Sequence, residues 1–254
     1  MWHLERIWEN KSIWILILAL VILVALSVKI QGGIRNGGFF RKDIVKEEKQ
    51  PAPAQTREAV SYVSASVTME KPQIALTFDD GHSDACTPRL LDGLKERGVK
   101  ATFFLIGENA KENPELVKRL DEEGHLIGNH TYHHVEITKV SDEEAKKEIL
   151  DTNKVITSIT GKSVEYMRPP FGLWQRNLEM EIEVLPVMWT IDPLDWTTEN
   201  VDEIVNTVVT EAEENDIILL HDCYDSSVDA ALRIIDILQK KEFEFVTVDQ
   251  LIMN

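Results

Sequence analysis

Cysteine is scarce in this sequence: among 254 residues there are only two, Cys86 and Cys223. Two cysteines are too few for a disulfide framework, and their spacing does not match a zinc-ribbon pattern. Because sequence alone does not place their Cα atoms within bonding distance, two thiols and one disulfide both remain open. With 43% hydrophobic and 28% charged residues, the chain has the composition of an ordinary globular protein.

Positive charge is also in short supply, with 27 Lys and Arg against 44 Asp and Glu, and a net charge of −17. Residues 1–50 hold eight of the bases and five of the acids, so the acidic excess lies beyond residue 50. An acidic domain repels phosphate backbones, which argues against nucleic acid as a partner. A neutral or cationic polymer is compatible with this charge, and nothing predicts a protein partner.

Long runs without charge are absent except at residues 13–28, which lie between Lys11 and Lys29. This run shows no polar face and is close to the length of a membrane-spanning helix. We therefore expect residues 1–30 to form one N-terminal transmembrane helix. A signal peptide, cleaved near the weak small-residue site at residues 25–27, is the alternative and would give a secreted protein.

Residues 31–70 contain two glycine pairs, a mixed charge run and a Pro-Ala repeat at 51–54. The glycine pairs do not form a phosphate loop, because no strand precedes them and no Gly-Lys-Ser/Thr follows. The composition predicts a flexible linker before a domain at 71–254.

Short apolar runs alternate with amphipathic stretches from residue 71 onward. Candidate strands lie at 74–78, 101–106, 126–127, 164–167, 184–189, 217–220 and 243–246. Helix starts are predicted with proline in the first position at Pro88 and Pro114, with a capping box at 141–144, and after Asn200. This alternation indicates a parallel α/β fold with functional residues at the carboxyl ends of the strands.

Two of these strand ends carry a candidate metal site. Asp79 and Asp80 follow the first strand, where a lone Asp-Asp-Gly would more commonly be a solvated turn. His130 and His134 follow the third strand, and on a helical turn this spacing would place both on one face. Asp80 and the two histidines would supply three ligands and leave a fourth position open, as in catalytic zinc sites.

Three further strand ends supply polar groups. Arg168 precedes two prolines, which fix an extended path, and it could orient a carboxylate through paired hydrogen bonds. Asp195 stands beside Trp196 after the 184–189 run. His221 ends an apolar strand, and histidine is the side chain best suited to donate a proton at neutral pH. Each segment alone is weak evidence, but the five strand ends together supply metal ligands, a base, an orienting group and an acid.

The sequence resembles the polysaccharide deacetylase family, carbohydrate esterase family 4, whose shared unit is the NodB homology domain. Five family motifs occur in order over residues 71–254: TFDDG at 77–81, H-T-x-x-H at 130–134, R-x-P at 168–170, D-x-x-D-W at 192–196 and L-x-H at 219–221. The resemblance implies a distorted (β/α) barrel and the metal-dependent removal of acetyl groups from N-acetylated polysaccharide, with release of acetate.

The resemblance also implies roles for individual residues. Asp80, His130 and His134 would hold one divalent ion, most often Zn²⁺, with Co²⁺ or Ni²⁺ tolerated. By the same resemblance, Asp79 would be the general base and Arg168 would position it. His221 would be the general acid, and Asp195 would orient His221 and raise its pKa. The backbone N–H of Phe171 would bind the oxyanion, and Trp196 and Leu219 would form the walls of the acetyl pocket.

Alternatives to this function stay open. A glycoside hydrolase with two carboxylates would leave the three histidines unexplained. A non-catalytic wall-binding module would be expected to have lost motif residues, and an O-acetyl (xylan-type) esterase would use the same site. We favour peptidoglycan N-acetylglucosamine as substrate, because an anchor and a linker suit a fixed polymer outside the membrane. The positive-inside rule conflicts with an extracellular domain, since basic residues are more numerous after the apolar run than before it.

Overall fold

The computed structural model describes residues 71–81, 83, 85–174 and 183–253. The predicted transmembrane helix (1–30) and linker (31–70) lie outside these residues, so both stay predictions. Within the described ranges, no helix combines the length and apolarity that crossing a membrane requires.

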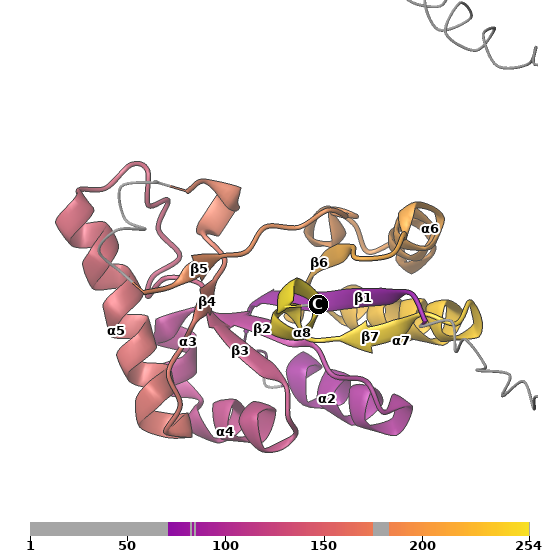
Figure 1. Cartoon of the computed structure of the whole chain (residues 1–254), viewed down its shortest axis with the longest axis horizontal. Helices are drawn as coiled ribbons and strands as arrows, with labels where there is room; N and C mark the ends of the chain where they lie inside the picture. Colours follow the sequence, from indigo (N-terminus) through magenta and orange to yellow (C-terminus); the bar gives the residue numbers. More distant parts are fainter. Residues whose placement is uncertain (1–70, 82, 84, 175–182, 254) are drawn as a thin grey trace, which may run out of the picture. The chain divides into compact units, whose positions relative to one another are not determined.

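A parallel sheet forms the centre of the described region (Figure 1). Its strands run in the order β5-β4-β3-β2-β1-β6, and β7 pairs with the first half of β1. The strand bounds are β1 Gln73–Asp80, β2 Thr102–Leu105, β3 Leu126–Asn129, β4 Tyr166–Met167, β5 Leu185–Pro186, β6 Ile217–His221 and β7 Glu244–Val246. The α/β class predicted from the sequence is confirmed, and the sheet is curled into a half-barrel.

The segment after β5 runs from one edge of the curled sheet to the other. The N–H of Val187 donates to the carbonyl of Met167 in β4. A few residues later, Ile191 forms a parallel bridge with Ile218 of β6. Residues 187–191 therefore connect the two edges of the curled sheet.

Side chains on β1 alternate between the two faces of the sheet, as the period of a strand requires. Ile74, Leu76 and Phe78 are fully buried in the main core beneath the helices. Ala75 belongs to a second cluster on the inner face. Thr77 and Asp79 follow the same alternation, so a polar row lies inside the curl at the end of an apolar strand.

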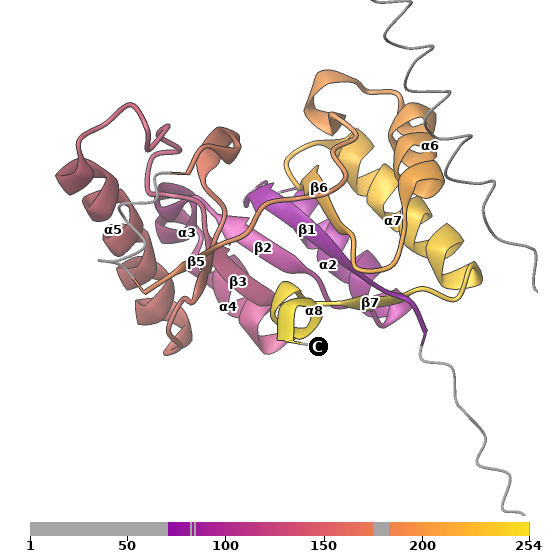
Figure 2. The ribbon, with the colours of Figure 1, turned by 45° about the horizontal axis from the view of Figure 1, so that its top comes forward.

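Helices follow nearly every strand, and most of them cover the outer face (Figures 1 and 2). The last helix, α8, instead packs against the inner cluster that contains Ala75. In Figure 2, α5 and α6 lie at opposite ends of the described region. The helix bounds are α2 Cys86–Arg97, α3 Gly107–Glu112, α4 Pro114–Glu122, α5 Asp142–Thr160, α6 Val201–Glu211, α7 Asp225–Lys240 and α8 Val248–Met253, with short 3-10 helices η1 Pro170–Gly172 and η3 Asp195–Thr197.

Three predicted helix starts are confirmed. Pro114 is the first residue of α4. Ser141 caps α5 by accepting a hydrogen bond from the N–H of Glu144, and Asn200 caps α6 through the N–H of Glu203. The prediction for α2 was wrong by two residues, since this helix begins at Cys86 and Pro88 is its third residue.

The predicted strand at 184–189 was also wrong in length, because only residues 185 and 186 pair with β4. Arg168 explains the early end of this strand. Its guanidinium donates to the carbonyl groups of Val187 and Met188, which a longer strand would use in the sheet.

Candidate active site

The carboxyl ends of the strands place the predicted residues together. In the sheet register, Asp79 of β1 lies beside Phe104 of β2 on one side and His221 of β6 on the other. Because all these strands are parallel, the residues that follow them gather at the same edge.

Asp80, His130 and His134 form a group whose ligand atoms all lie within 4.8 Å of one another. One carboxylate oxygen of Asp80, Oδ1, is 3.7 Å from Nε2 of each histidine. This oxygen is buried and accepts no hydrogen bond from any described residue. A buried carboxylate oxygen without a donor is costly unless a cation is bound there.

The hydrogen bonding of His130 also fits a metal ligand. Its Nδ1 lies 2.6 Å from the carbonyl oxygen of Arg168, which can only accept, so Nδ1 carries the proton. Nε2 then presents a lone pair toward Asp80. A metal-binding histidine is normally fixed in this way by a donor bond from its other nitrogen. The three residues are consistent with a divalent metal site, and their oxygen and nitrogen donors suit zinc among several ions.

The segment 130–134 is not a helical turn, so the predicted reason for the two histidines sharing a face was wrong. Thr131 and His134 have positive φ angles of 62° and 56°. The turn that they form brings the two imidazole rings to a centroid distance of 4.9 Å. Tertiary contacts, rather than helical periodicity, hold the pair.

Arg168 is fully buried and reaches across the inside of the curl to Asp79. Its Nη1 donates to Oδ1 of Asp79 at 2.8 Å and to the hydroxyl of Thr77 at 2.7 Å. The guanidinium lies over the ring of Phe104, 4.3 Å from its centroid. The predicted pair of bonds to one carboxylate is not formed, since the other nitrogens bind the carbonyls of Val187 and Met188. Burial lowers the pKa of Arg168 from its ordinary value, and the charge of Asp79 opposes this change.

His221 and Asp195 form a second charged pair. Oδ1 of Asp195 lies 2.8 Å from Nδ1 of His221, and Oδ2 accepts the backbone N–H of the same histidine at 2.8 Å. Burial by itself would lower the pKa of His221. The hydrogen bond and charge of Asp195, with smaller effects of Asp79 and Asp80, outweigh it and raise the pKa to about 9.

A cleft of about 440 Å³ opens over this edge of the sheet. Both sets of charged groups face it, and aromatic and aliphatic side chains form much of its wall. Phe171 and Trp196 are 62% and 56% exposed, so they offer apolar surface to a ligand. The cleft is lined by Asp79, Asp80, His130, His134, Pro169, Phe171, Trp189, Asp192, Leu194, Trp196, Leu219, His221 and Tyr224.

Every residue predicted for the site is found here, including the buried Arg168 and Asp195 behind the cleft wall. Tyr224, which was not predicted from the sequence, is 43% exposed and also lines the cleft. Its position three residues after His221 was the available signal. Both cysteines are free thiols in the structure. Burial, with the nearby charges of Asp80 and Asp222, raises the pKa of the Cys223 thiol to about 12.

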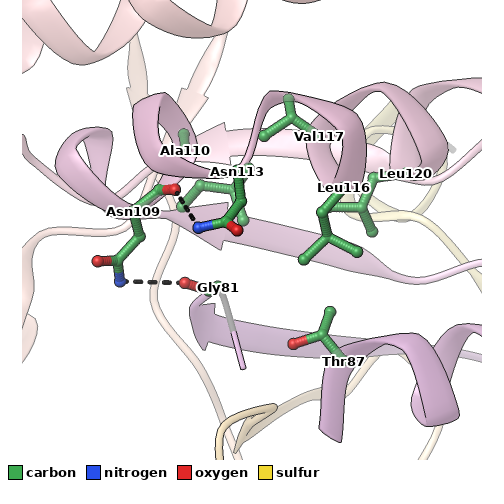
Figure 3. Close-up of a pocket in the computed structure, with 9 residues that line it drawn as sticks. Gly81, Thr87, Asn109, Ala110, Asn113, Leu116, Val117 and Leu120 are labelled. Atoms are coloured by element: carbon green, nitrogen blue, oxygen red, sulfur yellow. Dashed lines mark hydrogen bonds between the residues drawn. The ribbon is translucent and has the colours of Figure 1, made fainter. Parts of the chain in front are cut away.

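Asn109 of α3 supports the loop after β1 and was not predicted either. Its side-chain amide donates to the carbonyl of Gly81 at 3.0 Å (Figure 3). The backbone N–H of Ile106 holds the carbonyl of Asp80 at 3.1 Å. The small pocket drawn in Figure 3 lies behind this loop and is mainly apolar, so it belongs to the support of Asp80 and Gly81.

Comparisons with known proteins agree with this geometry. A family model described as polysaccharide deacetylase matches residues 66–187. The peptidoglycan-N-acetylglucosamine deacetylase of Bacillus cereus is 40% identical over 184 residues, which cover 70% of this chain and 67% of that protein. The peptidoglycan-N-acetylmuramic acid deacetylase PdaC of Bacillus subtilis is 37% identical over 211 residues, which cover 83% of this chain and 44% of that protein.

The chain therefore spans less than half the length of PdaC. A solved structure of peptidoglycan deacetylase PdaC from Bacillus subtilis matches with a TM-score of 0.70 and 39% identity, covering 71% of this chain and 90% of that one. The chain belongs to the polysaccharide deacetylase family, carbohydrate esterase family 4, and is a hydrolase of that family.

Proposed function

We propose that this protein removes the N-acetyl group from N-acetylglucosamine of peptidoglycan and releases acetate. The observation that carries the proposal is the cleft in which Asp79, the Asp80–His130–His134 group and His221 lie together. A glycoside hydrolase with two carboxylates does not require a metal-binding group and a histidine acid in its cleft. A non-catalytic binding module would not require the complete set of catalytic residues.

Asp80, His130 and His134 would hold a divalent ion, for which we propose Zn²⁺. When bound, the ion supplies Lewis acidity, which polarises the acetamide carbonyl and makes water a stronger acid. Phe171 stands beside this group, with its ring 4.9 Å from that of His134. Phe171 also lines the cleft, and we assign its backbone N–H to the oxyanion that forms during attack.

Asp79 acts as the general base. Arg168 occupies its Oδ1, which leaves Oδ2 on the side of His130, at 3.8 Å from Nε2 of that ring. Oδ2 takes the proton of the attacking water, and the fixed guanidinium stabilises the carboxylate in the orientation that this transfer needs. Arg168 acts through Asp79 and does not contact the substrate.

His221 acts as the general acid. Asp195 binds its Nδ1, so Nε2 is the nitrogen left to face the substrate. With a pKa of about 9, the imidazole is protonated at neutral pH. Nε2 donates its proton to the departing sugar nitrogen as the bond to the acetyl carbon breaks, and the products are acetate and a free amine. Trp196 and Leu219 wall the space for the acetyl methyl group.

The choice of N-acetylglucosamine draws on the relatives, several of which carry this sugar in their names. An N-terminal anchor at 1–30 and a linker at 31–70 would hold the domain (71–254) beside the polymer, outside the cell membrane. Protease added to intact cells tests this placement. Digestion of the domain in intact cells supports this placement. A domain that is protected in intact cells and digested only after the cells are lysed contradicts it.

Acetate release tests the activity itself. Metal-stripped full-length protein in detergent is given purified peptidoglycan or N-acetylglucosamine oligomers, with and without Zn²⁺, beside His130→Ala and Asp79→Asn. We expect zinc-dependent acetate release from the wild type and at least a ~100-fold loss in both variants. Zinc-loaded wild type that releases acetate only from O-acetylated xylan would replace the proposal with the esterase alternative.

A further inference from the structure

Glu148 of α5 is a buried carboxylate beside the turn that carries the two histidines. Its side chain is 8% exposed. One oxygen, Oε2, accepts the backbone N–H groups of Tyr132 and His133 at 2.9 and 2.8 Å. The other oxygen, Oε1, lies 2.7 Å from Nδ1 of His133. A buried carboxylate needs such donors, and here the turn between His130 and His134 supplies every one of these three.

The opposite side of the same turn is held by the start of α3. The N–H of Gly107 donates to the carbonyl of Thr131 at 2.9 Å, and that of Glu108 donates to the carbonyl of Tyr132 at 3.0 Å. Glu148 thus closes the second side of a clamp around residues 131–133. A side chain added at Gly107 would meet Tyr132 Cδ2 at 2.6 Å, so there is little room for the turn to move.

The turn needs this support because its conformation is unfavourable. Thr131 and His134 both have positive φ, which costs about 1–3 kcal/mol for a residue other than glycine. Threonine is β-branched, and for such a residue a positive φ is a true outlier. Without the clamp, the segment would relax to ordinary φ angles and turn His134 away from Asp80.

We propose that Glu148 is a positioning residue for metal binding: it holds residues 131–133 in the conformation that points His130 and His134 toward Asp80. The inference rests on the proposed function, since it assumes that these three residues bind a divalent ion. Glu148 makes no contact with the ligand atoms and acts through the backbone. His133, which lies between the two ligands in sequence, serves as one of its contacts.

The test is the zinc affinity of the full-length protein in detergent, measured by competition with a chromogenic chelator. We expect Glu148→Ala to bind zinc ~10–100-fold more weakly than the wild type, the range found for residues that orient metal ligands. Glu148→Gln retains one acceptor oxygen for the two N–H groups and should bind with intermediate affinity. Asp151→Ala is the matched control: it removes a half-exposed acid about one turn further along α5, which forms a salt bridge with Lys147, and it should bind zinc like the wild type.

Thermal unfolding of the metal-free proteins separates positioning from general stability. A merely structural role would lower the melting temperature of metal-free Glu148→Ala and leave the zinc affinity of the folded protein unchanged, which would overturn the inference. If Glu148→Ala does not fold, Glu148→Gln decides, and wild-type affinity in that variant overturns the inference. A wild type that binds no zinc would instead overturn the proposed function, and the inference with it.

Discussion

At the scale of single residues, the pairing of His221 with Asp195 predicts a pH dependence. Asp195 raises the pKa of this histidine to about 9 against the effect of burial. An acid catalyst must be protonated, so the activity of the wild type should fall as the pH rises through about 9. In Asp195→Asn the negative charge is gone and burial prevails, so the alkaline limb should move down by at least about two pH units.

Profiles of kcat/KM against pH, with saturating zinc, check this prediction. At pH 8 this shift should leave Asp195→Asn with about 10% of the wild-type kcat/KM or less, because the fraction of protonated His221 falls by that factor. Asp202→Asn removes a surface acid that pairs with Arg233 and should leave the profile unchanged. An unshifted alkaline limb in Asp195→Asn would show that His221 does not donate the proton.

The burial and the hydrogen bonds of Arg168 predict a large loss of stability when it is replaced. It is fully buried and binds Asp79, Thr77 and two carbonyl groups at once, which the single ammonium group of lysine cannot do. We expect Arg168→Lys to lower the free energy of unfolding by about 3–5 kcal/mol, as for other broken buried pairs. Urea denaturation measures the loss.

Arg89→Lys is the control for this substitution. Arg89 bonds to Asp225 and Asp229, but all three side chains are at least 40% exposed. Surface pairs of this kind contribute about 0–1 kcal/mol, so the control should unfold at nearly the wild-type urea concentration. Equal losses in the two variants would contradict the role given to the buried guanidinium.

At the scale of elements, the loop after β1 depends on Gly81. This residue has a φ of +60°, and a Cβ built on it would lie 2.2 Å from Cδ2 of Leu105. Gly81→Ala should therefore strain the loop and displace the neighbouring Asp80. We expect about 2–4 kcal/mol of lost stability, from the φ angle and from overpacking together, and a weaker affinity for zinc.

Gly98→Ala separates the two causes. Gly98 ends α2 with a φ of +66° but has no atom within 4 Å of a built Cβ. Gly98→Ala should therefore lower the free energy of unfolding only by the cost of the φ angle, roughly 1 kcal/mol, and leave the zinc affinity unchanged. Denaturation and zinc titration of both variants provide the comparison, and similar zinc affinities would show that Asp80 does not depend on the close packing of Gly81.

The elements also show where prediction from sequence succeeds. Apolar runs located β1, β2 and β6 closely, because a buried parallel strand reads as a continuous apolar segment. The sequence therefore predicted that Asp79 and His221 lie at the same edge of the sheet, and in the structure the two residues are register partners on neighbouring strands. The turn at 130–134 was mistaken for a helical one, because its conformation is imposed by Glu148 and by α3, 15 residues and more away in sequence.

At the scale of the whole molecule, ligand binding and folding stability are linked. The site joins groups from β1 and from the turn after β3, and one of its oxygens is buried without a donor in the described structure. A cation that binds there stabilises the folded state alone, since the unfolded chain does not bring Asp80 and the histidines together. The stabilisation is RT ln(1 + [L]/Kd), or about 2.7 kcal/mol at a hundredfold excess over Kd.

For a domain of this size, such a gain corresponds to a rise in melting temperature of about 5–10 °C. Scanning calorimetry of the metal-stripped protein, with zinc added stepwise, should show the rise growing with the logarithm of the zinc concentration. The rise should disappear in His134→Ala, which removes one proposed ligand. It should persist in His125→Ala, because His125 is buried elsewhere and binds the backbone N–H of Ala101. A rise of equal size in both variants would place the ion outside the cleft, and the mechanism would have to be rebuilt without it.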